Sequence, residues 1–423
     1  MDIIYPVTDK FRAREVTELD FDADVFKEHL YVNLDEVRGR EYADDIKFSL
    51  NLRDDKLVEL TSGYIKILFS GHRGSGKTTE LQRLHNSINH TDAYYSIFIE
   101  LEKETVVGSF QPEDLYILII TKLIESLEAS GITFESEILN QLASELVTEE
   151  EITGTIKKKD GSEIKAEAGA SVGFFKFFKL GVDYKASFAS ENELSNKTRR
   201  IVKSKPLEII RQFNQVLDEI REKVKDAGKG KDIAFIIDGS EKMGFDTYKK
   251  LCVEDSVLFK EINCNIIFSV PINAWFNIVS APMSFTDDYT LPMIKIDGNS
   301  HALSCLEDII NKRIDHNSFF EAGVLRFCVE KSGGCIRQLL NIVNRCIVIA
   351  KLNIITMPIA EKAVAQLGQK IYERLDGEHL DIIKTGDYAP GKPKVTEMLF
   401  GLALLKYNGS IKVNPLLKAY INK

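Results

Sequence analysis

The chain has 423 residues, and its 55 Lys and Arg against 64 Asp and Glu give a formal net charge of −9 at pH 7. A hydrophobic fraction of 44% is ordinary for a globular protein, and 28% charged residues of both signs exclude a disordered tail and a coiled rod. The net acidity argues against a protein whose whole surface coats DNA, although it leaves room for a local basic patch.

The length predicts two or three domains, since a domain usually takes roughly 100–200 residues. No run of about 18 apolar residues is present, so we expect no transmembrane segment. The first six residues have neither the basic start nor the apolar core of a secretion signal, which predicts a cytoplasmic protein. The six cysteines lack CxxC spacing, so we expect small buried residues in a reducing compartment rather than a disulfide framework or zinc site.

Residues 1–60 are acidic and partly helical in pattern, and we assign them to an N-terminal helical lead-in. The run 64–70 (YIKILFS) predicts a buried strand, because it is short, apolar and β-rich and is followed by glycine. A helix is expected from about residue 76 to 85.

Between this strand and helix lies GHRGSGKT, residues 71–78, which fits the pattern GxxxxGK[ST]. Glycines allow a tight curl in which successive N–H groups form a phosphate-sized nest, and the following helix adds the positive end of its dipole. In such a loop the lysine reaches the β- and γ-phosphates and the threonine hydroxyl binds Mg²⁺. The candidate nucleotide-binding residues are therefore Gly71, Arg73, Gly74, Ser75, Gly76, Lys77, Thr78 and Thr79.

Further along, a strand is predicted at 94–100 and a helix from Pro112 to about Glu128. Residues 152–203 differ, because they carry more basic than acidic side chains and alternate like strands, so we expect a basic, β-rich insertion. Its FFKFFK run, residues 174–179, either packs on the body or contacts a partner, a membrane interface or single-stranded nucleic acid. An amphipathic helix then begins at Pro206.

The apolar run 233–238 predicts a strand that ends in Asp238 and is followed by Gly-Ser-Glu241. A carboxylate at this edge of a parallel sheet lies where Mg²⁺ beside phosphates needs a ligand, so Asp238 and Thr78 are the candidate metal ligands. Glu241 is the nearest candidate for a base that activates water, with a surface or outer carboxylate as the alternative. Strands at 265–270 and 292–296 complete the pattern, which predicts an α/β fold with a three-layer αβα core and a parallel sheet over 61–300.

After residue 300 the pattern is mostly helical, and residues 332–340 (SGGCIRQLL) begin one of these helices. Near the end, Asn408-Gly409 between short apolar runs predicts a two-residue hairpin. Within 392–423, six lysines face only one acidic residue, Glu397, which indicates either phosphate contact or a solvated lysine-rich face.

The order of these elements resembles the AAA+ and STAND branches of the P-loop ATPases. The DGSE sequence at 238–241 resembles the NACHT-type Walker B element, and Ser269 takes the place of a sensor of the γ-phosphate. The GCIR sequence at 334–337 is similar to the helix start that carries the second sensor of origin-recognition-type ATPases, and RGRE at 38–41 is similar to a Gly-Arg-Glu element beside the adenine. By this resemblance Arg337 and Arg40 join the candidate site residues.

The resemblance implies a helical lid at 301–376, a winged-helix-like domain at 377–423, and ATP and Mg²⁺ as cofactors. It also implies a slow or partner-stimulated ATPase with Lys77, Asp238, Glu241 and Arg337 in the catalytic set. Such proteins form homo-oligomers in which an arginine, here guessed as Arg313, completes the neighbouring site, and they control a separate effector, often in bacterial antiphage defence. The alternatives are an ATP-dependent DNA-binding loader or transposition-type ATPase, with nucleic acid as the partner, and a scaffold that binds nucleotide without hydrolysing it.

Overall fold

A computed structural model describes residues 3–19, 21, 24–39, 42–58, 63–105, 107–146, 193–241, 243–254, 257–278, 285–389 and 391–421. The N-terminal part contains short helices and one small hairpin, which agrees with the partly helical pattern of the sequence. Its elements are α1 (Lys10–Val16), α2 (Asp35–Arg38), α3 (Tyr42–Ser49), β1 (Leu52–Arg53) and β2 (Lys56–Leu57).

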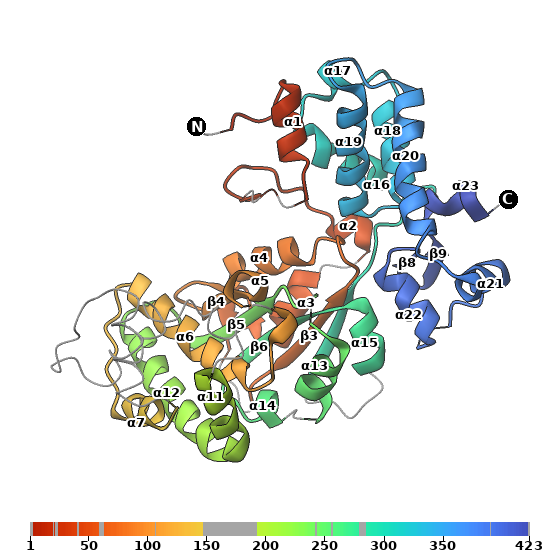
Figure 1. Ribbon diagram of the computed structural model, residues 1–423. Helices are drawn as coiled ribbons and strands as arrows, with labels where there is room; N and C mark the ends of the chain where they lie inside the picture. The colour runs from red at the N-terminus through yellow and green to blue at the C-terminus, as the bar shows by residue number, and fades with distance from the viewer. Residues whose placement is uncertain are drawn as a thin grey trace.

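A five-stranded parallel sheet lies at the centre of the molecule, in the order β4-β5-β6-β3-β7 (Figure 1). Its strands in chain order are β3 (Lys66–Gly71), β4 (Tyr94–Glu100), β5 (Asp232–Asp238), β6 (Asn265–Pro271) and β7 (Asp287–Leu291). The four strands predicted from apolar runs are confirmed within two residues at each end. The predicted strand at 292–296 is wrong, because the edge strand β7 lies just before it, where Asp287 and Asp288 interrupt the apolar pattern.

Helices cover both faces of this sheet, as the alternation of strands and helices predicted. On one face, buried side chains of α3 and of α4 (Lys77–Ile88) pack against β3. On the other face, side chains of α6 (Asp114–Ala129) and α12 (Pro206–Asp226) pack against β4 and β5. The remaining helical segments of this part are α5 (Leu101–Glu104), the 3₁₀ turn η1 (Val107–Ser109), α7 (Glu137–Leu146), α11 (Glu193–Ser204), α13 (Phe245–Lys249), the π-helical turn η3 (Lys250–Glu254), α14 (Val257–Lys260) and α15 (Ile272–Ile278).

The predicted basic insertion at 152–203 falls mostly outside the described residues. Its described end, residues 193–203, belongs to α11 and is helical, so the expectation of strands is wrong there. Arg199 of α11 forms an ion pair with the buried Asp114 of α6, with 2.7 Å between Nη2 and Oδ2. This pair connects the described end of the predicted insertion to α6, which comes earlier in the chain.

The C-terminal third packs into two further clusters beside the sheet (Figure 1). We call the first the helical unit, residues 300–372, which holds α16 (Ser300–Asn311), α17 (His316–Phe319), α18 (Val324–Ser332), α19 (Ile336–Ala350) and α20 (Met357–Tyr372) and buries one side of α1. We call the second the C-terminal unit, residues 377–421, which holds α21 (Gly377–Thr385), α22 (Pro393–Phe400), β8 (Leu404–Tyr407), β9 (Ser410–Val413), the 3₁₀ turn η4 (Pro415–Leu417) and α23 (Lys418–Ile421). The predicted Asn408-Gly409 hairpin is confirmed, since Tyr407 pairs with Ser410.

All six cysteines lie buried as free thiols, which confirms the expectation of small buried residues. None of the described helices combines the length and the apolarity that crossing a bilayer requires.

Candidate functional site

The glycine-rich segment 71–78 connects the carboxyl end of β3 to the first turn of α4. Gly74 and Gly76 have φ of 81° and 98°, a left-handed backbone that other residues rarely adopt. Ser75 stabilises the curl, since its hydroxyl donates to the His72 carbonyl at 2.9 Å. The loop therefore has the curled shape that its glycines predicted. The side chain of Arg73 is exposed, and its charge is among those that lower the pKa of Glu241.

Two residues that are far apart in sequence meet at this edge of the sheet. The Thr78 hydroxyl donates to Oδ2 of Asp238 at 2.5 Å, and the Ser269 hydroxyl donates to Oδ1 of the same carboxylate. Asp238 is 1% exposed, and its burial, together with the nearby charge of Glu241, raises its pKa. The structure thus brings together the two oxygen-bearing side chains that the sequence suggested as metal ligands.

Lys77 forms an ion pair with Glu241, with 2.9 Å between Nζ and Oε1, and their side chains are only 3% and 17% exposed. Its Nζ also lies 3.2 Å from the carbonyl oxygens of both Gly71 and His72. Burial acts to raise the pKa of Glu241, but the adjacent Lys77 outweighs it and the pKa is lowered. Glu241 is therefore held as a carboxylate in contact with the lysine of the loop.

The first turn of α19 rests on the glycine-rich loop. The Arg337 N–H donates to the Gly74 carbonyl at 3.2 Å, and a Cβ on Gly74 would lie 2.1 Å from Cβ of Arg337. Any larger residue at position 74 would therefore push the helix away. The turn before α19 is equally close to the body, since a Cβ on Gly334 would lie 1.8 Å from the Ile294 carbonyl oxygen.

An arginine that the sequence reasoning did not select reaches the loop from the N-terminal side. Arg38 is 2% exposed and donates to the Ser75 carbonyl at 2.6 Å and to Oε1 of Glu80 at 2.7 Å. The predicted residue, Arg40, lies outside the described residues. Arg38 and Arg40 both belong to the RGRE sequence, which gives no reason to prefer one over the other. In the structure Arg38, the last residue of α2, reaches the loop.

A small cavity of about 70 Å³ lies beside Gly76. Thr79 and Arg38 line it, together with Tyr31 and with Ile309 and Arg313 of the helical unit. Arg313 donates to the carbonyl of Ile309 at 2.8 Å, inside its own subunit. The guess that Arg313 completes the site of a neighbouring subunit stays a prediction.

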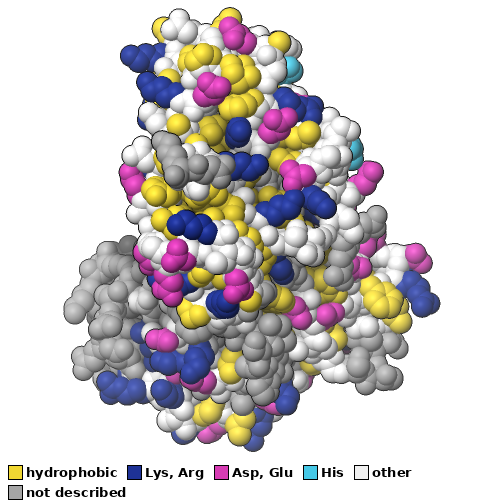
Figure 2. Space-filling view, turned by 90° about the vertical axis from the view of Figure 1, so that its right-hand side faces the viewer, with side chains coloured by type: hydrophobic (Ala, Val, Ile, Leu, Met, Phe, Trp, Pro, Cys, Tyr) yellow, Lys and Arg dark blue, Asp and Glu magenta, His cyan; other side chains and the backbone are white. Residues whose placement is uncertain are grey.

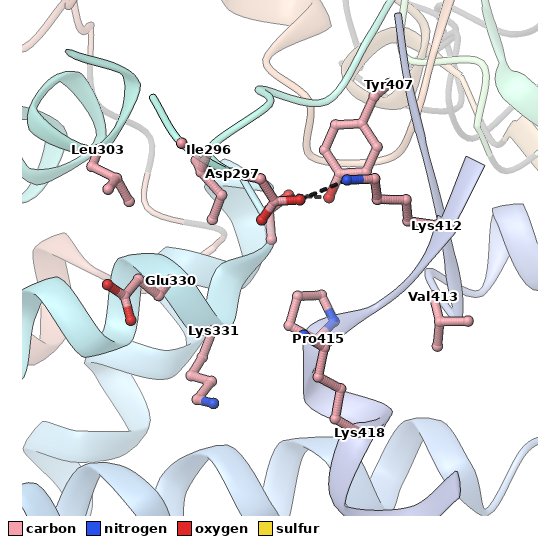
Figure 3. A pocket seen from close by; sticks show the side chains of 12 residues that line it. Ile296, Asp297, Leu303, Glu330, Lys331, Tyr407, Lys412, Val413, Pro415 and Lys418 are labelled. Carbon is pink, nitrogen blue, oxygen red and sulfur yellow. Dashed lines mark hydrogen bonds and ion pairs between the residues drawn. The ribbon is translucent and has the colours of Figure 1, made fainter. Parts of the chain in front are cut away.

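A cavity of about 630 Å³ lies away from the loop, between the helical unit and the C-terminal unit (Figure 3). Asp297 and Lys412 form an ion pair in its wall, with 2.6 Å between their charged atoms. It contains none of the predicted site residues.

The lysines of the C-terminal unit are less available than their number in the sequence indicates. Lys392 pairs with Asp387, and Lys394 lies 2.9 Å from Asp376, in addition to the pairing of Lys412. On the face of the molecule shown in Figure 2, basic and acidic side chains are mixed. This arrangement does not favour a phosphate-binding face in the described part of the unit.

No protein-family model and no curated protein matches this sequence.

Proposed function

We propose that the chain binds and hydrolyses ATP with Mg²⁺ and belongs among the AAA+/STAND-like switches. One observation carries this proposal: Thr78 and Asp238 meet at 2.5 Å beside Lys77, although 160 positions separate them in the sequence. A hydroxyl at the start of a helix and a carboxylate at the end of a nearby parallel strand form the usual magnesium pair of phosphoryl-transfer sites.

The chemistry of the site residues supports a proposal of ATP and Mg²⁺ as its ligands. The backbone N–H groups of the loop and the start of α4 suit an anion, and Lys77 supplies a positive charge for the phosphates. Thr78 and Asp238 would hold Mg²⁺, which neutralises phosphate charge when bound. The buried hydroxyl of Ser269 orients Asp238 from the side opposite Thr78.

Glu241 is the candidate base for hydrolysis. Its lowered pKa keeps the carboxylate able to accept a proton from a water molecule at neutral pH. It now contacts Lys77, so it becomes available for this step when Lys77 binds phosphate. The binding of phosphate to Lys77 and the release of Glu241 from Lys77 would therefore occur together.

The switch would operate through the two C-terminal clusters, with the helical unit as the lid and the C-terminal unit as a winged-helix-like domain. The contact between Arg337 and Gly74 supports this proposal, because a change at the loop must move the start of α19. By the same resemblance we propose that the protein oligomerises in the cytoplasm and controls a separate effector, as in bacterial antiphage defence.

Calorimetric titration of the full chain with ADP and with a non-hydrolysable ATP analogue, with and without Mg²⁺, tests the proposal. We expect wild type to bind, Lys77→Ala to lose most of the affinity, and Asp238→Asn to lose the gain from Mg²⁺. The exposed Lys249→Ala is the matched control and should bind as wild type. Binding that is equally strong in Lys77→Ala would overturn the proposal.

Phosphate release separates a hydrolysing switch from a scaffold that only binds nucleotide. We expect Glu241→Gln to bind nucleotide and to turn it over at least a hundred-fold more slowly, within the range of general base catalysis. Light scattering on size-exclusion fractions in each nucleotide state tests assembly. One size in every state would exclude nucleotide-driven oligomerisation.

A further inference from the structure

His72, the second residue of the glycine-rich loop, is fully buried against the C-terminal unit. Its Nε2 lies 2.7 Å from the backbone N–H of Lys406 in β8, and its Nδ1 lies 3.2 Å from the carbonyl oxygen of Leu399 in α22. A backbone N–H only donates, so Nε2 accepts and Nδ1 carries the proton that is donated to Leu399. The two contacts fix one neutral tautomer of His72.

The backbone carbonyl of the same residue is turned to the other side, into the candidate site. It accepts from Nζ of Lys77 at 3.2 Å and from the Ser75 hydroxyl at 2.9 Å. One residue thus holds the C-terminal unit with its side chain and the loop lysine with its backbone.

The residues that follow Lys406 contact two other segments around the loop. The Tyr407 hydroxyl donates to the Gly333 carbonyl at 2.6 Å, just before α19, and the Asn408 side chain donates to the Arg38 carbonyl at 2.6 Å. Three consecutive residues of the C-terminal unit therefore bind the loop, the start of α19 and the end of α2. Of these three contacts, the one to His72 reaches the loop itself.

We propose that His72 is a positioning residue through which nucleotide binding at Lys77 and docking of the C-terminal unit reinforce each other. An ammonium has three N–H donors, and Lys77 uses them on two carbonyls and on Glu241. A phosphate replaces Glu241, whereas the carbonyls of Gly71 and His72 continue to aim Nζ. The docked unit holds the His72 carbonyl in place through the imidazole, and by linkage a bound nucleotide stabilises the docking. This inference rests on the proposed function.

The single tryptophan of the chain reports on this docking. Nζ of Lys406 lies 4.7 Å from the centre of the Trp275 ring, on α15. Trp275 emission and the hydrogen exchange of peptides covering β8 can therefore be followed in the full chain while a Mg²⁺ complex of ADP or of the ATP analogue is titrated.

We expect nucleotide to change Trp275 emission and to slow exchange in β8 of wild type. In His72→Ala, affinity should fall on the order of ten-fold and both signals should disappear. His72→Gln restores an acceptor toward Lys406 and His72→Asn restores a donor toward Leu399, so each should recover part of the coupling. The matched control is His85→Ala, because His85 bonds Ser96 instead of the C-terminal unit.

The possible outcomes separate this inference from the proposed function. If wild type binds nucleotide but neither signal responds, or if His72→Ala responds as strongly as wild type, the coupling through His72 is overturned and the ATP site stands. If wild type binds no nucleotide, both fall. If His72→Ala does not fold, the Gln and Asn variants decide, and coupling at the wild-type level in both would overturn the role of these hydrogen bonds.

Discussion

Glu241 occupies the position on Lys77 that a phosphate would take, which makes nucleotide affinity sensitive to its charge. At the observed 2.9 Å and an effective dielectric constant of about 20, the Coulomb attraction is roughly 6 kcal/mol. Desolvation of both groups offsets most of it, and a hydrogen bond to a charged partner contributes about 1.5–3 kcal/mol net. Since phosphate has to displace Glu241, Glu241→Gln should bind nucleotide roughly ten- to hundred-fold more tightly than wild type.

Calorimetric titration of the full chain with ADP in the presence of EDTA measures this effect without a contribution from Mg²⁺. Glu254→Gln is the matched control, because it removes an exposed carboxylate that pairs with Lys249 at 2.8 Å. Unchanged or weaker binding by Glu241→Gln would refute the idea that the carboxylate and phosphate compete for Lys77.

Three further predictions concern the contacts around the loop. Arg38→Ala should lower the free energy of unfolding in urea by about 3 kcal/mol, because the buried carboxylate of Glu80 loses its ion pair with Arg38. A loss under about 0.5 kcal/mol would contradict this. Burial lowers the pKa of His72 from 6.5 to about 3, so on acidification the unfolded chain binds a proton at this residue before the folded chain does. The free energy of unfolding should therefore fall between pH 6.5 and pH 3, by up to about 1.4 kcal/mol per pH unit. This contribution should be absent in His72→Gln. In thermal denaturation, Gly74→Ala should lower the free energy of unfolding by about 2 kcal/mol more than Gly391→Ala does. Both glycines have positive φ, but of the two only a Cβ at position 74 would collide with Arg337. Equal losses in the two variants would exclude this collision as the cause.

The sequence predicted the centre of the fold well because its signals are local there. Buried parallel strands such as β3 and β5 are apolar runs with sharp ends, and the glycine-rich loop needs its glycines at fixed positions. The edge strand β7 was misplaced because its two aspartates remove that signal. Edge strands have one neighbour and greater exposure, so their composition is less constrained.

The contacts that frame the loop could not be predicted, because they depend on how distant segments pack. Nothing near position 72 indicates that its imidazole meets backbone groups at 399 and 406. The sequence alone does not distinguish Arg38 from the arginine at position 40. In the structure α2 ends at Gly39, and Arg38 donates to the carbonyl of Ser75. Beside Glu397, which pairs with Lys394, the partners of these C-terminal lysines are Asp297, Asp376 and Asp387, which lie outside the segment in which the charges were counted.

The strand order also affects how the chain is synthesised. All six residues of β3 are buried, yet its two neighbours in the sheet come much later, with Lys66 opposite Ile266 and Ile67 opposite Asp287. A growing chain therefore carries this strand without any partner until β6 ends at residue 271, and without its second partner until β7 ends at residue 291. Unpaired strands of this kind aggregate readily, so slow translation or a truncation before β7 should make the chain depend on chaperones. The strand β3, which leads into the candidate site, is thus synthesised early and pairs with its neighbours in the sheet late.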